Sequence, residues 1–221
     1  MKRLNLSSEK GIYLVLDPQA KPEEELFQDL KGVFQYPLIA VQIWDHFSPE
    51  QDARAFIENV CELANPYLFP VLINNSWEWV NKTALDGVHF DQIPADFTPI
   101  RKRLPKNTLL GLTCTNDLSL LQKAEEKGFD YLSFCSVFPS ANAGACELVS
   151  KGTLRKAAEC SNLPFFLAGG IRTDNLGELA SIPHQGLALI SGIMGQANPA
   201  KAMEQFSYLL KTKKSNEVNN D

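Results

Sequence analysis

"LPFFLAGGIRTDN", residues 163–175, is the stretch from which the fold can be worked out. An apolar run ends at two consecutive glycines, and a polar segment with the composition of a helix start follows directly. A dense apolar run of this length is typical of a strand that is buried on both faces, as strands of parallel sheets are. The stretch therefore predicts a buried strand, a glycine turn and the beginning of a helix.

The same unit recurs along the whole chain. Apolar runs rich in β-branched and aromatic residues occupy 11–17, 38–44, 70–75, 87–90, 108–114, 131–137, 164–170 and 186–192. Helices are expected over 22–35, 48–64, 76–84, 98–104, 116–128, 149–161, 173–181 and 198–212. Near-continuous apolar strands that alternate with helices imply parallel pairing, and eight such units predict closure into a (β/α)8 TIM barrel. A doubly wound open sheet is the structural alternative.

Two of the helices carry recognisable boundary signals. In "SPEQDARAFIENVCELA", Ser48 is expected to cap the helix, with Pro49 in the first position and Gln51 completing a capping box. The helix in "NDLSLLQKAEEKG" is expected to end at Gly128, because glycine adopts the left-handed conformation that often terminates a helix.

Length and composition favour a single domain. The chain has 221 residues, of which 44% are hydrophobic and 21% charged, enough for one sizeable core. We expect a short lead over 1–10, the barrel over 11–212 and a polar tail over 213–221. A net charge of −5 argues against nucleic acid as a partner, because binding to its phosphates needs a basic face.

Cysteine usage and hydropathy indicate the compartment. The five cysteines are widely spaced without a Cys-x-x-Cys pair, which suits reduced thiols better than a disulfide framework. No apolar run approaches the length of a membrane span, and the N-terminus turns polar before a signal-peptide core could form. We expect a soluble, cytoplasmic protein without a membrane partner. The sequence leaves open whether it forms a homo-oligomer.

In a parallel barrel, ligands bind at the C-terminal ends of the strands. Two adjacent ends stand out, because Gly169 and Gly170 follow the seventh strand and Ser191 and Gly192 follow the eighth. Bare backbone N–H groups at these two ends predict a phosphate site, and a Cβ at Gly170 would block the approach of the anion. A tight turn before a helix is the alternative explanation of the glycine pair.

Seven motifs in order resemble the thiamine phosphate synthase and thiazole tautomerase family over about residues 11–208. They are "GIYLVLD", "VQIWDH", "VLINN", "GVHFDQ", "LGLTCTNDLSLLQKAEEKGFDYLSFCSVFP", "LPFFLAGGIRTDN" and "LALISGI". The resemblance implies a (β/α)8 barrel that binds thiazole phosphate and thiamine phosphate. Synthases of this family join hydroxymethylpyrimidine diphosphate to thiazole phosphate and release pyrophosphate with the help of Mg²⁺.

In that reaction a pyrimidine carbocation forms as pyrophosphate leaves. Cationic side chains and a metal are needed to stabilise the leaving anion. By resemblance, Gln42 matches a family glutamine, whereas Trp44 and His46 stand where the family has an arginine and a lysine. After the sixth strand, the family's Pro-Thr-x-Thr-Lys reads "PSANA", which places Ser140 and Asn142 at the threonines and Ala143 at the lysine. Three cations of the family pattern are therefore replaced.

The metal positions are altered as well. Asn74 matches the family's asparagine, Asn75 replaces the neighbouring metal-binding aspartate, and Pro94 falls on the second aspartate. Asn75 and Asp91 are the candidate ligands for Mg²⁺, which prefers hard oxygen donors. Thr113 replaces a serine of the synthases, and Thr115 occupies the position of the tautomerase histidine.

The candidate site divides into three groups. Catalytic roles are assigned to Gln42, His46 and Thr113, and phosphate binding to Gly169, Gly170, Ile190 and Ser191. The pyrimidine and diphosphate pocket is assigned to Trp44, Asn74, His89, Ser140 and Asn142. Since alternate strand residues share a face, Gln42, Trp44 and His46 are expected to line one pocket, where Trp44 could stack on a flat heterocycle.

Three functions follow from this pattern. The first is a thiamine phosphate synthase that has diverged at the diphosphate and metal positions, with Asp17, Asp91 or Asn75 retaining the metal. The second is a thiazole tautomerase-like isomerase in which His46 or His89 handles the proton. The third is a noncatalytic protein that binds thiazole or thiamine phosphate.

Overall fold

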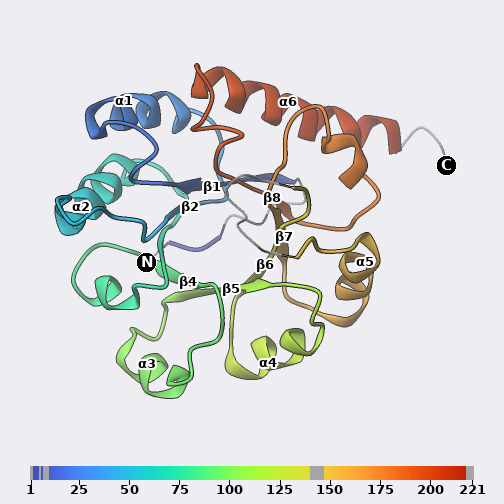
Figure 1. Cartoon of the computed structure of the whole chain (residues 1–221), viewed down its shortest axis with the longest axis horizontal. Helices are drawn as coiled ribbons and strands as arrows, with labels where there is room; N and C mark the ends of the chain where they lie inside the picture. The colour runs from blue at the N-terminus through green and yellow to red at the C-terminus, as the bar shows by residue number, and fades with distance from the viewer. Residues whose placement is uncertain (1, 5, 7–9, 140–146, 218–221) are drawn as a thin grey trace.

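The computed structural model describes residues 2–4, 6, 10–139 and 147–217, and it forms one closed barrel (Figure 1). The eight strands are parallel and follow in the order β1 to β8, with β8 pairing back to β1. Their bounds are β1 Gly11–Leu16, β2 Ala40–Ile43, β3 Val71–Asn74, β4 Gly87–Phe90, β5 Leu109–Cys114, β6 Tyr131–Cys135, β7 Phe165–Ala168 and β8 Gly186–Leu189. The (β/α)8 barrel is thus confirmed, and the open sheet is excluded.

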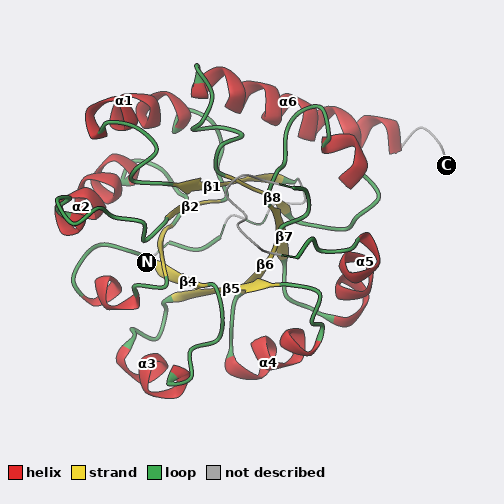
Figure 2. Ribbon diagram, in the orientation of Figure 1, coloured by secondary structure: helices red, strands yellow, loops and turns green. Residues whose placement is uncertain are grey.

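Helices surround the strands on the outside of the barrel (Figure 2). They are α1 Glu23–Val33, α2 Ala53–Ala64, η1 Trp77–Asn81, α3 Phe97–Arg103, α4 Ser119–Lys127, α5 Lys151–Cys160, η3 Leu176–Leu179 and α6 Pro199–Glu217. The α-helices predicted over 76–84 and 173–181 are instead short 3-10 helices, η1 and η3. The last helix runs to Glu217, beyond the predicted end at residue 212.

The predicted cap of α2 is wrong. The helix begins at Ala53, and its N-cap is Asp52, whose side chain accepts a hydrogen bond from the backbone N–H of Ala55. Ser48 and Gln51 form a separate turn before the helix, in which the Ser48 backbone N–H donates to the Gln51 side chain at 3.0 Å. At the other predicted boundary, Gly128 ends α4 in the left-handed conformation with φ 73°, as expected.

The core has two parts because strand residues alternate between the two faces of the barrel wall. The larger part packs between strands and helices. The smaller part fills the barrel interior and consists of Tyr13, Val15, Ile39, Ala40, Leu72, Leu109, Tyr131, Phe166 and Ala188. Four partly buried side chains, Leu4, Trp44, Ala168 and Ile190, pack against this interior cluster. The interior is therefore solid, and a ligand can bind only where it opens at the ends of the strands.

Candidate active site at the barrel mouth

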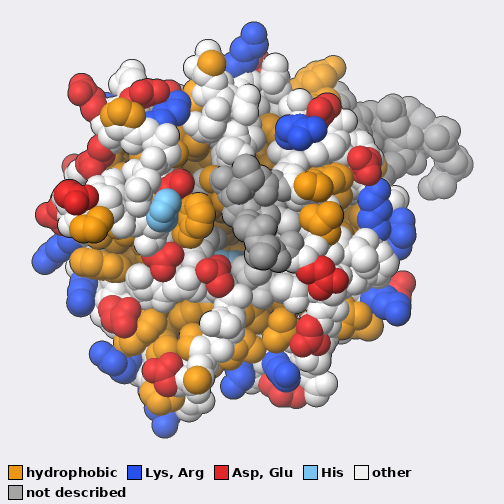
Figure 3. Space-filling view, in the orientation of Figure 1, with side chains coloured by type: hydrophobic (Ala, Val, Ile, Leu, Met, Phe, Trp, Pro, Cys, Tyr) orange, Lys and Arg blue, Asp and Glu red, His pale blue; other side chains and the backbone are white. Residues whose placement is uncertain are grey.

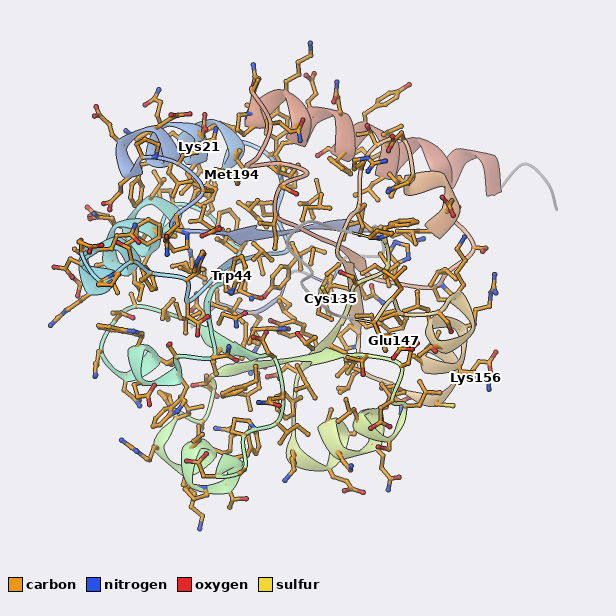
Figure 4. All side chains as sticks on the ribbon, viewed as in Figure 1. Lys21, Trp44, Cys135, Glu147, Lys156 and Met194 are labelled. Carbon is orange, nitrogen blue, oxygen red and sulfur yellow. The ribbon has the colours of Figure 1, made fainter. Side chains whose placement is uncertain are left out.

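The C-terminal ends of the eight strands, called the barrel mouth below, carry most of the candidate residues. In Figure 3, acidic side chains lie both near the centre of this face and around its edge, while lysines and arginines lie mainly toward the edge. Figure 4 shows Trp44 and Cys135 toward the barrel centre and Lys156 at the outside, on α5. The mouth thus combines an aromatic and polar floor with negative charge.

On one side of the mouth, the structure brings together four predicted residues. The Gln42 amide donates to the Asn74 side-chain oxygen at 2.5 Å, and the Asn74 amide donates to Asp91 at 3.1 Å. Asn75 also donates to Asp91 at 2.9 Å, while its own oxygen accepts from the Asp91 backbone N–H at 3.0 Å. Asn75 adopts φ 46°, a left-handed conformation that asparagine tolerates better than most residues. These contacts hold the Asp91 carboxylate in place.

On the other side, Gln42 belongs to a buried network of side-chain hydrogen bonds. The Tyr13 hydroxyl donates to Gln42 at 2.9 Å and lies 2.7 Å from the Tyr131 hydroxyl. His89 is within hydrogen-bond distance of Tyr131 through Nδ1, at 3.0 Å, and of Thr113 through Nε2, at 2.9 Å. Burial lowers the pKa of His89 to about 4, against the opposing effect of the Asp91 charge. The imidazole is therefore neutral at neutral pH.

Trp44 and His46 lie together, as their alternation predicts. Their ring centroids are 5.1 Å apart, and Trp44 also packs on the barrel interior cluster. His46 lies further out, with its side chain 51% exposed and Nδ1 3.2 Å from an Asp17 oxygen. One face of the mouth thus offers an aromatic surface that ends at an imidazole and a carboxylate.

The electrostatics of the mouth are dominated by acids. In the described chain, the first three residues after every strand include Asp17, Asp45, Asp91 and Asp117 but no lysine or arginine. Burial raises the pKa of the Asp45 carboxyl, and the nearby Asp91 charge raises it further.

Cations further along the loops are engaged elsewhere. Lys21 pairs with Asp29 at 2.6 Å, Lys151 with Glu178 at 3.0 Å, and Arg172 with Asp174 at 3.1 Å. Lys82 lies over the Trp79 ring, 5.2 Å from its centroid. Each of these four cations therefore has a partner within the described chain.

For a metal ion, the most suitable oxygens belong to Asp45 and Asp91. No group of three or more His, Cys, Asp or Glu side chains arranged to hold a metal occurs among the residues that the structure describes. The Asn75 oxygen already accepts the Asp91 backbone N–H. Asp45 and Asp91 are close enough for one charge to raise the pKa of the other carboxyl, and a divalent cation between them would relieve that repulsion. The two carboxylates fit Mg²⁺ as a partial ligand set.

At the ends of β7 and β8, backbone donors are available for an anion. Within the described chain, the N–H groups of Gly170, Ser191 and Gly192 donate to no protein acceptor. Ser191 is exposed, and the pairing of Ala168 with Ala188 in the ladder brings the two strand ends side by side. Unpaired N–H groups at two adjacent strand ends are what a phosphate oxygen needs.

The glycine pair is also required by the local backbone, in line with the tight turn that the sequence offered as an alternative. Gly169 and Gly170 have φ 91° and φ 64°, and a Cβ on Gly170 would lie 2.5 Å from the Pro139 carbonyl oxygen. A Cβ on Gly169 would overlap the Ser136 side chain. Backbone conformation and the neighbouring segment after β6 therefore require glycine here, whether or not a phosphate binds.

Two of the predicted pocket residues, Ser140 and Asn142, lie outside the described residues. Cys61 and Cys114 are buried, which raises the pKa of each thiol to about 12, so neither is a nucleophile at neutral pH.

Sequence reasoning missed Tyr13, Tyr131 and Asp45. The first two could have been found, because a tyrosine inside an apolar strand needs a polar partner for its hydroxyl.

The fold is a (β/α)8 barrel with a cluster of polar side chains at the C-terminal ends of its strands. The family model described as "Thiamine monophosphate synthase" matches residues 12–193. The chain belongs to this family.

Among curated relatives, the thiamine-phosphate synthase of Nitrosococcus oceani is 27% identical over 187 residues, covering 85% of this chain and 86% of the relative. That of Picrophilus torridus is 31% identical over 144 residues, or 65% of this chain and 70% of the relative. The solved structure of thiamine phosphate pyrophosphorylase from Pyrococcus furiosus superposes with a TM-score of 0.78 at 24% identity, covering 92% of this chain and 96% of that one. No helix in the described part of the chain could cross a lipid bilayer.

Proposed function

We propose that this protein is a thiamine phosphate synthase, which joins hydroxymethylpyrimidine diphosphate to thiazole phosphate and releases pyrophosphate. The observation that carries the proposal is that the backbone N–H groups of Gly170, Ser191 and Gly192 have no acceptor among the residues that the structure describes, on a chain of this family. These donors suit the phosphate of the thiazole, and the polar floor formed by Gln42, Asn74 and Thr113 lies within the same mouth.

The pyrimidine would lie against the aromatic face of the mouth. Trp44 offers a flat ring surface, and stacking on it substitutes for part of the recognition that the family obtains from charge. Gln42 and Asn74 are held by their hydrogen bonds, so they present a fixed polar surface without reorganisation when the substrate arrives.

The departing diphosphate requires positive charge, and the first three residues after each described strand contain no lysine or arginine to supply it. Mg²⁺, when held by Asp45 and Asp91, would supply that charge and orient the leaving group. The protein's own contribution is to keep both carboxylates in position, through the amides of Asn74 and Asn75 around Asp91 and through the Ser76 hydroxyl, 3.5 Å from Asp45.

The first test is an assay of the purified protein with both substrates and Mg²⁺ that measures thiamine phosphate and pyrophosphate together. We expect equal amounts of the two products and none without Mg²⁺. Failure to form thiamine phosphate, at protein and substrate concentrations where a known synthase is active, would contradict the proposal.

A second test separates the phosphate site from the chemistry. Ser191→Glu places a negative charge at an exposed position beside the N–H groups of Gly170 and Gly192, whereas Ser191→Gln has the same size without the charge. We expect the glutamate variant to bind thiazole phosphate at least about tenfold more weakly than the glutamine variant, because a repulsion of about 1.4 kcal/mol is sufficient for that factor. Calorimetric titration of both variants measures it, and equal affinities would place the phosphate elsewhere.

A noncatalytic binder of thiazole phosphate is the second candidate. It is favoured by one observation, the absence of lysine and arginine from the first three residues after each strand of the described barrel. Binding of thiazole phosphate without product formation in the assay would support it over the synthase.

A further inference from the structure

We propose that seven side chains form one hydrogen-bond chain, from Thr113 through the barrel interior to Asp91 at the mouth, in which every donor points toward Asp91. This single direction fixes the tautomer of His89 and makes Thr113 a hydrogen-bond acceptor toward the mouth. Tyr13 and Tyr131 are then positioning residues that act on Thr113 through His89. The inference concerns the same mouth as the proposed function. Its test needs no substrate, so the failure of either proposal is recognised separately.

The direction is set at the Asp91 end. An ionised carboxylate can only accept hydrogen bonds, so both amides that contact Asp91 must point their nitrogens at it. Asn75 provides an independent check, because its oxygen accepts the Asp91 backbone N–H at 3.0 Å, which leaves its nitrogen for the carboxylate. Asn74 donates to the same oxygen at 3.1 Å and therefore turns its own oxygen toward Gln42.

Gln42 continues the same donor-to-acceptor direction. Its nitrogen donates to the Asn74 oxygen at 2.5 Å, so its own oxygen faces Tyr13. That oxygen accepts from the Tyr13 hydroxyl at 2.9 Å. Since a phenol has one proton, Tyr13 has no proton left for any other partner.

The two tyrosines carry the direction across the barrel. Their hydroxyl oxygens are 2.7 Å apart, a distance that requires a proton between them. Tyr13 has already donated its proton, so Tyr131 must supply this one. The Tyr131 oxygen then accepts from His89 Nδ1, at 3.0 Å.

The chain ends at Thr113. A neutral imidazole carries one proton, and here it lies on Nδ1, so Nε2 is an acceptor. The Thr113 hydroxyl donates to it at 2.9 Å. The lone pairs of Thr113 therefore remain for the mouth, where they suit an N–H or O–H donor on a ligand. The opposite direction would set the Asn74 oxygen against the Asp91 carboxylate, two acceptors with no proton between them.

The test is the ¹⁵N spectrum of the histidine rings in the whole protein, where the protonated and bare nitrogens are well separated. The chain has three histidines, and His46→Gln and His184→Gln assign the signals. His184 serves as an internal reference, because its Nδ1 lies 2.6 Å from the Ile182 carbonyl oxygen and must carry the proton. We expect His89 to show the same Nδ1–H pattern.

Tyr13→Phe tests whether the direction is transmitted. Without the Tyr13 oxygen, the Tyr131 proton has only His89 Nδ1 as a partner among the described contacts, so we expect the His89 proton to move to Nε2. Tyr67→Phe is the matched control, because Tyr67 contacts Gln35 at the surface and should leave the His89 signals unchanged.

Two results would overturn the inference. One is an Nε2–H tautomer of His89 in the unaltered protein, which shows that the chain runs the other way. The other is an unchanged Nδ1–H tautomer in folded Tyr13→Phe, which shows that the tyrosines do not set it. If Tyr13→Phe does not fold, Tyr131→Phe gives the same decision, since it removes the acceptor of Nδ1 and should also move the proton to Nε2.

Discussion

At the scale of single residues, Gly111 shows how tightly the barrel interior is fitted around the buried network. A Cβ at this position would overlap the Tyr131 hydroxyl and His89 Nδ1, both of which are fixed by their hydrogen bonds. Glycine is therefore required on β5 by the side chains of its two neighbouring strands.

We expect Gly111→Ala to lower the free energy of unfolding by about 1–3 kcal/mol, the usual effect of overpacking an interior. Gly152→Ala in α5 is the matched control, because its Cβ would meet only the Ser150 hydroxyl, at an ordinary 3.6 Å. The control should be neutral or up to about 1 kcal/mol more stable, since alanine favours helix. Urea unfolding of both variants measures the difference in unfolding free energy. Equal effects would mean that the Tyr131 and His89 side chains shift to accept the methyl group without loss of stability.

Two histidines make the protein sensitive to mild acid. Burial lowers the pKa of both His89 and His184 to about 4 in the folded state, with the Lys10 charge contributing at His184. In the unfolded chain their pKa is near 6.5, so the unfolded state binds more protons between these values. The stabilising contribution is complete above pH 6.5 and is lost as the pH falls toward 4, by about 3 kcal/mol for a fully buried histidine.

We therefore expect the free energy of unfolding to fall between pH 6.5 and 4 and to fall less steeply in His184→Gln. Urea titrations at four pH values in this window give the slope. An identical slope in the variant would show that His184 does not titrate as its burial implies.

At the scale of elements, the strands were predictable because their near-continuous apolar runs have no other stable location than a doubly covered sheet. Their ends were less predictable, and β7 stops at Ala168 rather than at Gly170, because the left-handed glycines leave the ladder. The segments after β3 and β7 have helix-like composition but fold as short 3-10 helices, which a periodicity argument does not separate from α-helices.

The start of α2 gives a direct test of the revised cap. We expect Asp52→Ala to destabilise the protein by about 1 kcal/mol, because the Ala55 N–H loses its acceptor. Ser48→Ala should change the unfolding free energy by less than about 0.5 kcal/mol, since the Ser48 contact is made by its backbone N–H. Thermal unfolding of the two variants measures both effects. A larger loss of stability in Ser48→Ala than in Asp52→Ala would show that Ser48 caps the helix, as the sequence predicted.

At the scale of the whole molecule, the sequence predicted where the site lies better than how it works. Strand ends are fixed by the fold, so Gln42, Asn74 and Thr113 lie toward the C-terminal ends of β2, β3 and β5, as the sequence predicts, while their roles stay predictions. The alternation of β1 and β6 residues that brings Tyr13 to Tyr131 depends on which strands face each other across the closed barrel. That information is absent from any single strand.

The acidic mouth predicts a response to Mg²⁺. We expect MgCl2 to raise the melting temperature above that in NaCl of equal ionic strength, because the cation relieves the repulsion between Asp45 and Asp91. Asp45→Asn should abolish this rise and should itself stabilise the metal-free protein, since it removes the charge that burial disfavours. Asp96→Asn, at an exposed site, is the control. An undiminished rise of the melting temperature with MgCl2 in Asp45→Asn would show that these carboxylates do not bind the metal.

The pairing of β1 with β8 also has a consequence for the way the chain is made. Gly11 lies beside Gly186 in the ladder, and a Cβ on Gly186 would overlap the Gly11 carbonyl oxygen, so no larger residue fits at this seam without a shift of the backbone. During synthesis, β1 leaves the ribosome first and has β2 on only one side. Its other edge has no native partner until almost the whole chain has been translated, so a nascent chain must protect one open strand edge for most of that time.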